Sequence, residues 1–105
     1  MLPKKIKVGM LCTFKKRHEN TWMGYQSLPF NEHAKPYHKK IKIIKLSTPF
    51  VTILEKRGSK FMGFWVSFSK VLATNEHGVH IKVWVMSEKL KPANKNYFNN
   101  QSNDL

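Results

Sequence analysis

The chain has 105 residues, the size of one domain built around a single core. Hydrophobic residues make up 41% of it, which is too many for a disordered chain. Lys and Arg number 19 against 6 Asp and Glu, so the net charge is +13 with neutral histidine. A charge this high repels itself in the folded state and is typical of proteins whose partner is a polyanion or an acidic surface.

The cations are almost all lysine: 17 are Lys and two are Arg. Lysine is a flexible point charge, whereas arginine is the planar fork that reads guanine edges. This bias favours contact with phosphates over reading of bases. Lys, Asn and Ile are all abundant, as in an AT-rich gene, so codon usage is an alternative source of the bias.

The single cysteine, Cys12, excludes an internal disulfide and indicates a reducing compartment. The N-terminal segment MLPKKIKVGMLCTFKKR has an apolar run too short for a signal peptide. No segment approaches the ~18 apolar residues of a membrane span. We therefore expect a cytoplasmic or nucleoid-associated protein that is not secreted and not held in a membrane.

The first half of the chain predicts one strand followed by a long excursion. KVGMLCTF, residues 7–14, alternates apolar and other residues as a strand does. Residues 15–40 contain two prolines and a glycine, and within them TWMGYQSL is predicted as a short irregular strand or hairpin arm. The tail, residues 93–105, is rich in Asn and is predicted to be flexible.

The second half predicts four strands, because its segments are β-branched or aromatic and lie between turn residues. VHIKVWV alternates most cleanly, with valine and isoleucine on one side and His80, Lys82 and Trp84 on the other. The predicted strands span residues 41–46, 50–56, 61–68 and 79–85.

One of these segments, KFMGFWVSFSK at residues 60–70, fits two patterns. Its rings recur at the i, i+3, i+4 and i+7 spacing of a helix, and its even-numbered residues alternate as on a strand. Phe, Trp and Val favour a strand, and Gly58 supplies a turn before it. We therefore predict one strand with a bend at Gly63, in which Phe61 and Trp65 point away from the face that carries Phe64.

Aromatic side chains beside lysines are the first candidate site. Trp84 neighbours Lys82, and Trp65 is predicted on the adjacent strand of the same face. Rings and cations on a sheet bind single-stranded nucleic acid, because bases stack on rings and phosphates contact ammonium groups. The alternative is that the 15–40 excursion covers both tryptophans and forms a second small core, since tryptophan is usually buried.

The basic runs are the second candidate site. They border strands and turns, and because acidic residues are scarce the summed field stays positive, although a charge run can also be only a solvated surface. With the aromatic residues, the candidate contacts to nucleic acid are Lys4, Lys5, Lys7, Lys15, Lys16, Arg17, Lys39, Lys40, Lys42, Arg57, Lys60, Trp65, Lys82 and Trp84.

Catalytic and metal-binding patterns do not emerge from the spacing. Five histidines and one cysteine form no C-x2-C or H-E-x-x-H pattern. The carboxylates do not pair for metal-dependent phosphoryl chemistry, and no glycine-rich phosphate loop is present. We expect no cofactor, no metal and no enzymatic activity, with a basic nuclease as the enzymatic alternative.

The opening IKVGMLCTF and the close VWVMSEKLKP resemble the first and last strands of SH3-like small β-barrels. The close resembles their last strand, a short 3₁₀ turn and a terminal L-x-P. KOW, Tudor-type and ribosomal-protein barrels belong to this class, and many of them bind nucleic acid or its machinery. The resemblance implies a mostly β domain at residues 1–92, a barrel of about five strands with a long loop after the first.

These observations predict a non-enzymatic protein that binds nucleic acid, DNA ahead of RNA, through the phosphate backbone with little sequence specificity. The oligomeric state is left open, as is the choice between duplex and single strand. The alternative is a basic interaction module that docks on an acidic protein, such as a polymerase or nuclease subunit. Small size and basicity also suit an accessory protein of a virus or mobile element.

Overall fold

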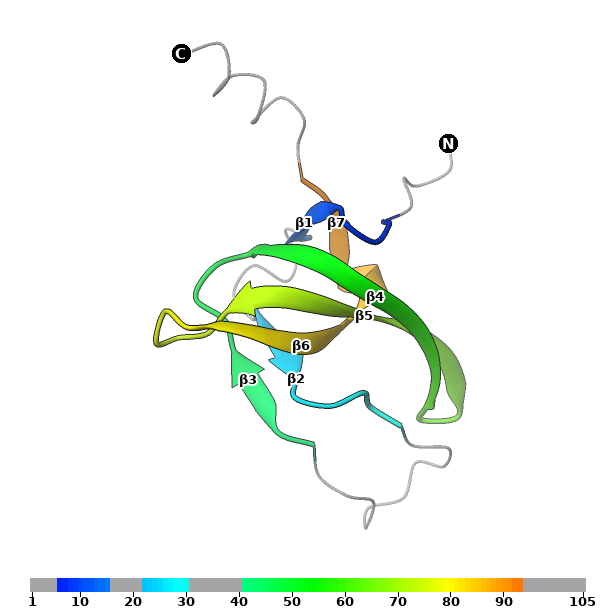
Figure 1. The fold of residues 1–105 in the computed structure, drawn as a ribbon. Coiled ribbons are helices and arrows are strands. Elements are labelled where there is room, and N and C mark those ends of the chain that lie inside the picture. The colour runs from blue at the N-terminus through cyan, green and yellow to red at the C-terminus, as the bar shows by residue number, and fades with distance from the viewer. Residues whose placement is uncertain (1–5, 16–21, 31–40, 94–105) are drawn as a thin grey trace.

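A single antiparallel sheet of seven strands makes up the fold (Figure 1). The computed structural model describes residues 6–15, 22–30 and 41–93. The sheet order is β3-β2-β6-β5-β4-β1-β7. The elements are β1 (Leu11–Phe14), β2 (Met23–Tyr25), β3 (Ile43–Lys45), β4 (Phe50–Phe61), β5 (Phe64–Thr74), β6 (His80–Met86), the 3₁₀ turn η2 (Ser87–Lys89) and β7 (Leu90–Pro92).

The prediction of a mostly β protein is confirmed, since these ranges contain strands and one 3₁₀ turn but no α-helix. The prediction of a barrel of about five strands is not confirmed, because the described residues form one sheet of seven strands. The sheet is not closed there, and β3 and β7 are its two edges. No helix within the same ranges is long and apolar enough to cross a membrane. The flexible tail predicted at 93–105 lies outside the described residues, apart from Ala93.

The main core lies against one side of the sheet. Alternate residues along the strands point to it, as the period of two along a strand requires, except at the irregularity between Ile53 and Glu55 of β4. In β1 the buried residues are Cys12 and Phe14, and Cys12 lies opposite Val51 of β4. The cluster consists of Ile6, Cys12, Phe14, Leu46, Val51, Ile53, Val71, Ala73, Val83, Val85 and Leu90.

The longest pairing is the β4–β5 hairpin, and its turn is not where the sequence predicted it. Met62 and Gly63 form the turn, with φ angles of 54° and 85°. A two-residue hairpin turn of type I′ requires positive φ at both positions, and glycine adopts it without strain. The turn predicted at Gly58 is therefore wrong: Gly58 lies inside β4, opposite Ser67. The single strand with a bend at Gly63 is also wrong.

This turn decides which side of the sheet each aromatic residue occupies. Phe61 lies directly opposite Phe64, and cross-strand partners share a face. The prediction that Phe61 points away from Phe64 is therefore wrong. Trp65 lies opposite Lys60, on the other side from Phe64. The predicted separation of Trp65 from Phe64 is confirmed.

A second, smaller aromatic cluster lies on the side of the sheet opposite the main core. The Phe61 and Phe68 rings are 5.9 Å apart, and the Tyr25 ring is 6.5 Å from each of them. Pro29 is fully buried, and its carbonyl accepts a hydrogen bond from the Ser59 hydroxyl. The 15–40 excursion thus covers this end of the β4–β5 hairpin, so part of the alternative interpretation is confirmed.

The hairpin arm predicted in TWMGYQSL is confirmed as β2. Its residues pair with β3 on one side, Gly24 opposite Ile44, and Tyr25 pairs with Trp84 of β6 on the other. Strand β3 is shorter than the predicted 41–46. The excursion therefore extends the sheet past β6 at this edge.

Gly24 is the position where β2 approaches the core most closely. A methyl group added at Gly24 would lie 2.7 Å from Val83 Cβ and closer still to Val83 Cγ2. Val83 is fully buried in the main core. We expect Gly24→Ala to lower the free energy of unfolding by about 1–3 kcal/mol, measured by urea denaturation, because overpacking strains a dense core.

Gly58→Ala is the matched control, since its added methyl would meet the Trp65 ring at an ordinary 3.5 Å. Alanine in a strand interior is expected to be neutral or to raise stability by about 0.5–1 kcal/mol. The double variant Gly24→Ala/Val83→Ala should lose less stability than the sum of its two single variants. Additive losses would contradict the close contact.

Burial of Cys12 in the core should make the stability of the fold depend on pH. Burial raises the pKa of its thiol from the ordinary 9.0 to about 11, although the Lys56 ammonium opposes the rise. Between these values the unfolded chain loses the proton and the folded chain keeps it. Stability should therefore fall as pH rises from 9 to 11, more steeply in the native protein than in Cys12→Ala. Parallel curves from urea denaturation would contradict this.

Candidate functional site

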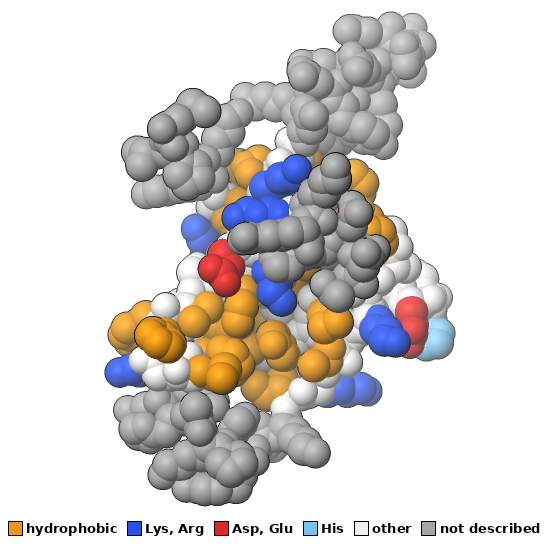
Figure 2. Space-filling model, turned by 180° about the vertical axis from the view of Figure 1, so that it is seen from behind, with side chains coloured by type: hydrophobic (Ala, Val, Ile, Leu, Met, Phe, Trp, Pro, Cys, Tyr) orange, Lys and Arg blue, Asp and Glu red, His pale blue; other side chains and the backbone are white. Residues whose placement is uncertain are grey.

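Five strands each place one cation on the side of the sheet opposite the main core. The register shows this, because Lys70 lies opposite Trp84 while Lys82 lies opposite Leu72, and both pairs share that side. These five cations are Lys45, Arg57, Lys70, Lys82 and Lys91, and we call them the cationic face. Figure 2 shows one face of the molecule, on which Lys and Arg side chains lie around a hydrophobic area.

Trp84 lies on the same side of the sheet as the cationic face but is itself buried, with 7% of its surface exposed. The Arg57 guanidinium carbon is 5.8 Å from the ring centroid, and the Lys70 ammonium is 6.0 Å from it. Both distances fall within the range of cation–π attraction. Tyr25 of β2 pairs beside the ring. Trp84 therefore holds two cations in place and is not open to a stacked base.

Little of the positive charge on this face is neutralised. The described ranges contain eleven Lys and Arg and three Glu, and within them Arg57 is the one Lys or Arg that forms an ion pair. Its partner is Glu55, two residues away on β4, and both side chains are partly exposed. An exposed pair of this kind contributes little energy and leaves the summed field positive.

Trp65 has a different position from Trp84, on the opposite side of the sheet. Its exposed fraction is 75%, and it lies opposite Lys60 on the β4–β5 hairpin. The prediction that Trp65, Lys82 and Trp84 share one exposed face is therefore wrong. The reason is the hairpin register, in which position 65 and position 70 fall on different sides.

The remaining predicted cations do not gather on the cationic face. Lys7, Lys15 and Lys42 lie in segments that flank β1 and β3, and Lys60 shares the side of Trp65. Among the predicted contacts, Arg57 and Lys82 belong to the face. Those outside the described residues are Lys4, Lys5, Lys16, Arg17, Lys39 and Lys40.

The sequence analysis missed three members of the face: Lys45, Lys70 and Lys91. Lys70 continues the alternation that begins at Phe64, so the strand pattern carried a signal for it. Lys45 and Lys91 lie on the edge strands β3 and β7. Their placement follows from the register of the whole sheet, which no local pattern reveals.

Trp65 lies over the one residue of its partner strand that lacks a side chain. The nearest ring atoms, Cε3 and Cζ3, are 3.5 and 3.6 Å from the position that a Gly58 methyl would occupy. On the other side of β5, strand β6 ends where Met86 pairs with Phe68. An open hollow of about 250 Å³ lies there, lined by Trp65, Val66, Ser67, Met86 and Glu88.

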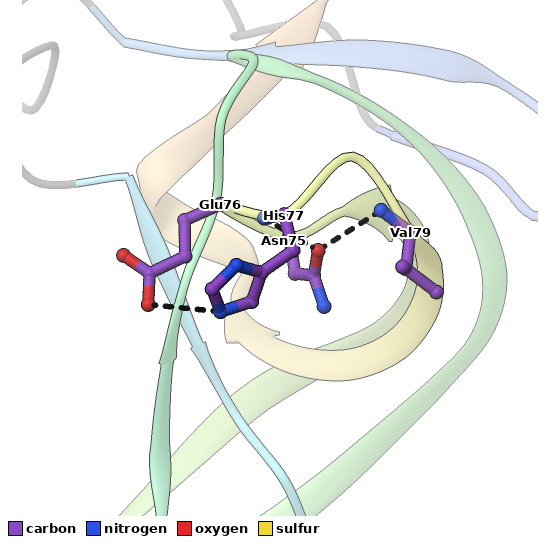
Figure 3. Close-up of polar contacts among 4 residues, drawn as sticks. All are labelled: Asn75, Glu76, His77 and Val79. Carbon is purple, nitrogen blue, oxygen red and sulfur yellow. Dashed lines mark hydrogen bonds and ion pairs between the residues drawn. The ribbon is translucent and has the colours of Figure 1, made fainter.

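The histidines of the β5–β6 turn bond locally. Asn75 Oδ1 accepts hydrogen bonds from the backbone N–H groups of His77 and Val79, each at 2.9 Å, and the Glu76 carboxylate lies 3.8 Å from His77 Nε2 (Figure 3). His80 Nδ1 shares a hydrogen bond with Thr74 Oγ1 at 3.2 Å. Within residues 6–15, 22–30 and 41–93, no three His, Cys, Asp or Glu residues group as metal ligands do.

No protein-family model matches the chain, and neither a curated protein nor a solved structure matches it.

Replacement of Trp84 and replacement of Trp65 should change the free energy of unfolding by very different amounts. Trp84→Ala should lower the free energy of unfolding by about 3–5 kcal/mol, because it empties a buried aromatic site. Trp65→Ala should change it by no more than about 0.5 kcal/mol, because the ring is mostly exposed. Chemical denaturation of both variants measures the difference. Equal losses would contradict the placement of the two rings.

Proposed function

We propose that the protein binds nucleic acid, DNA ahead of RNA, through the phosphate backbone and without enzymatic activity. The observation that carries the proposal is the cationic face, where one residue from each of five strands contributes a positive charge. Within the described strands, Glu55 is the one carboxylate on the same side of the sheet as these cations, opposite Lys70. A surface of this kind attracts a polyanion at long range and holds it by several weak contacts.

The chemistry of these cations supports low sequence specificity. Four of the five are lysines, which contact phosphates as point charges and do not read base edges in the forked manner of arginine. The one arginine, Arg57, is already engaged with Glu55 and with the Trp84 ring. Backbone contacts position a protein on nucleic acid without carrying sequence information.

A second candidate function is docking on an acidic protein, such as a polymerase or nuclease subunit. It is favoured by the apolar residues that the β4–β5 hairpin exposes at its tip: Met62, Phe64 and Trp65. Exposed aromatic anchors beside cations are typical of protein interfaces. A role as an accessory protein of a virus or mobile element would suit either function.

We also propose that the domain is SH3-like, with the long loop after the first strand elaborated into β2 and β3. The order of the other strands supports this, since without β2 and β3 the sheet reads β6-β5-β4-β1-β7. The 3₁₀ turn η2 precedes the last strand, as the resemblance of VWVMSEKLKP implies. Fold class alone does not give function, so the binding proposal rests on the cationic face.

Salt dependence tests the proposed function. Affinity for a labelled duplex, measured by fluorescence anisotropy, should fall with salt at a log–log slope of about −0.9 for each phosphate neutralised. Lys82→Gln and Lys91→Gln, which are exposed members of the face, should each reduce the slope by about one and weaken unrelated sequences equally.

Lys89→Gln is the comparison variant, because it removes the same charge from η2, outside the five residues that define the face. It should alter the slope less than either face variant does. Equal effects of all three would show that net charge matters and the face does not. Binding that is insensitive to salt would contradict phosphate contact, and cleavage of the labelled strand would indicate a nuclease.

A further inference from the structure

We infer that the Trp65 indole is a stacking platform for an unpaired base, so that the preferred ligand is single-stranded nucleic acid. The inference rests on the proposed function and names its substrate class. It places base contact on the Trp65 side of the β4–β5 hairpin. The cationic face lies on the other side of the sheet and supplies the general attraction.

The indole lies over a glycine and is mostly exposed. Its Cε3 and Cζ3 atoms lie over Gly58, at 3.5 and 3.6 Å from the position of an added methyl. The ring therefore lies over Gly58 with room for one methyl group between them, and 75% of Trp65 is exposed. Stacking on such a ring is sequence-tolerant, because every base has a π face.

The surroundings of Trp65 orient a bound strand. Lys60 lies opposite it on β4 and attracts a phosphate. Glu88 lines the hollow on the other side, with Val66, Ser67 and Met86, and its negative charge repels a phosphate. The backbone should therefore follow the Lys60 side while the base covers the indole and enters the hollow. A duplex cannot do this, because its bases are stacked inside.

Phe64 provides a control of the same kind on the same hairpin. Its exposed fraction is 73%, nearly that of Trp65, but it lies on the opposite side of the sheet. Its cross-strand partner is Phe61, so it has neither a glycine beneath it nor a lysine opposite it. Removal of either ring takes away a similar exposed apolar surface. Only removal of Trp65 takes away a ring that lies over a glycine and beside a lysine.

The test compares the affinity of the full-length protein and its variants for a labelled mixed-sequence 12-nucleotide DNA strand and for the matching duplex. Trp65→Ala should bind the single strand about 5- to 100-fold more weakly, the range that loss of one stacked base produces. Its duplex affinity should stay within twofold of the native value. Trp65→Phe should recover most of the single-strand affinity, and Phe64→Ala should bind both ligands as the native protein does.

The outcomes separate the two proposals. If the native protein binds neither ligand, the proposed function fails, and this inference fails with it. If it binds both and Trp65→Ala leaves single-strand affinity unchanged, the inference is overturned while phosphate binding stands. Equal losses in Trp65→Ala and Phe64→Ala would also overturn it, because they would indicate a general apolar contact. Thermal melting of each variant checks that the fold is intact.

Discussion

The two-residue turn at Met62–Gly63 is the constraint on which the rest of the structure depends. It fixes the register of β4 against β5 from Phe61 back to Glu55, beyond which an irregularity between Ile53 and Glu55 shifts the pairing. β6 pairs with the other edge of β5. Because side chains alternate along a strand, a slip of one residue would exchange the two sides of the sheet. The turn therefore places Phe61 opposite Phe64 and Lys60 opposite Trp65. The β5–β6 register then places Lys70 opposite Trp84.

The two sides of the sheet carry different side-chain clusters. On one side, Tyr25 and the rings of Phe61 and Phe68 form a second core, and the buried Trp84 holds the cations of Arg57 and Lys70. A fixed cation loses less conformational entropy on meeting a phosphate than a free one. On the other side, the hairpin extends past the end of β6 and presents Trp65. A strand bound by both surfaces would pass around the hairpin.

The sequence predicted the strands better than it predicted their turns. The alternation in residues 79–85 identified β6, because its valines form part of the core. Gly58 and Gly63 were each compatible with a turn or a strand interior, and the choice depends on which cross-strand pairs form. The burial of Trp84 depends on Tyr25, about sixty residues earlier in the chain, which no periodicity reveals. Lys45 and Lys91 join the site only through the order of the whole sheet.

The most direct measurement is a titration of ¹⁵N-labelled protein with a single-stranded oligonucleotide, followed at the tryptophan indole N–H signals by NMR. The chain has three tryptophans, so each signal can be assigned with one Trp→Phe variant. The account predicts that the Trp65 signal shifts strongly on binding and that the Trp84 signal, buried beneath its cations, shifts little. A shift at Trp84 with none at Trp65 would contradict the account, as would binding that leaves all three signals unchanged.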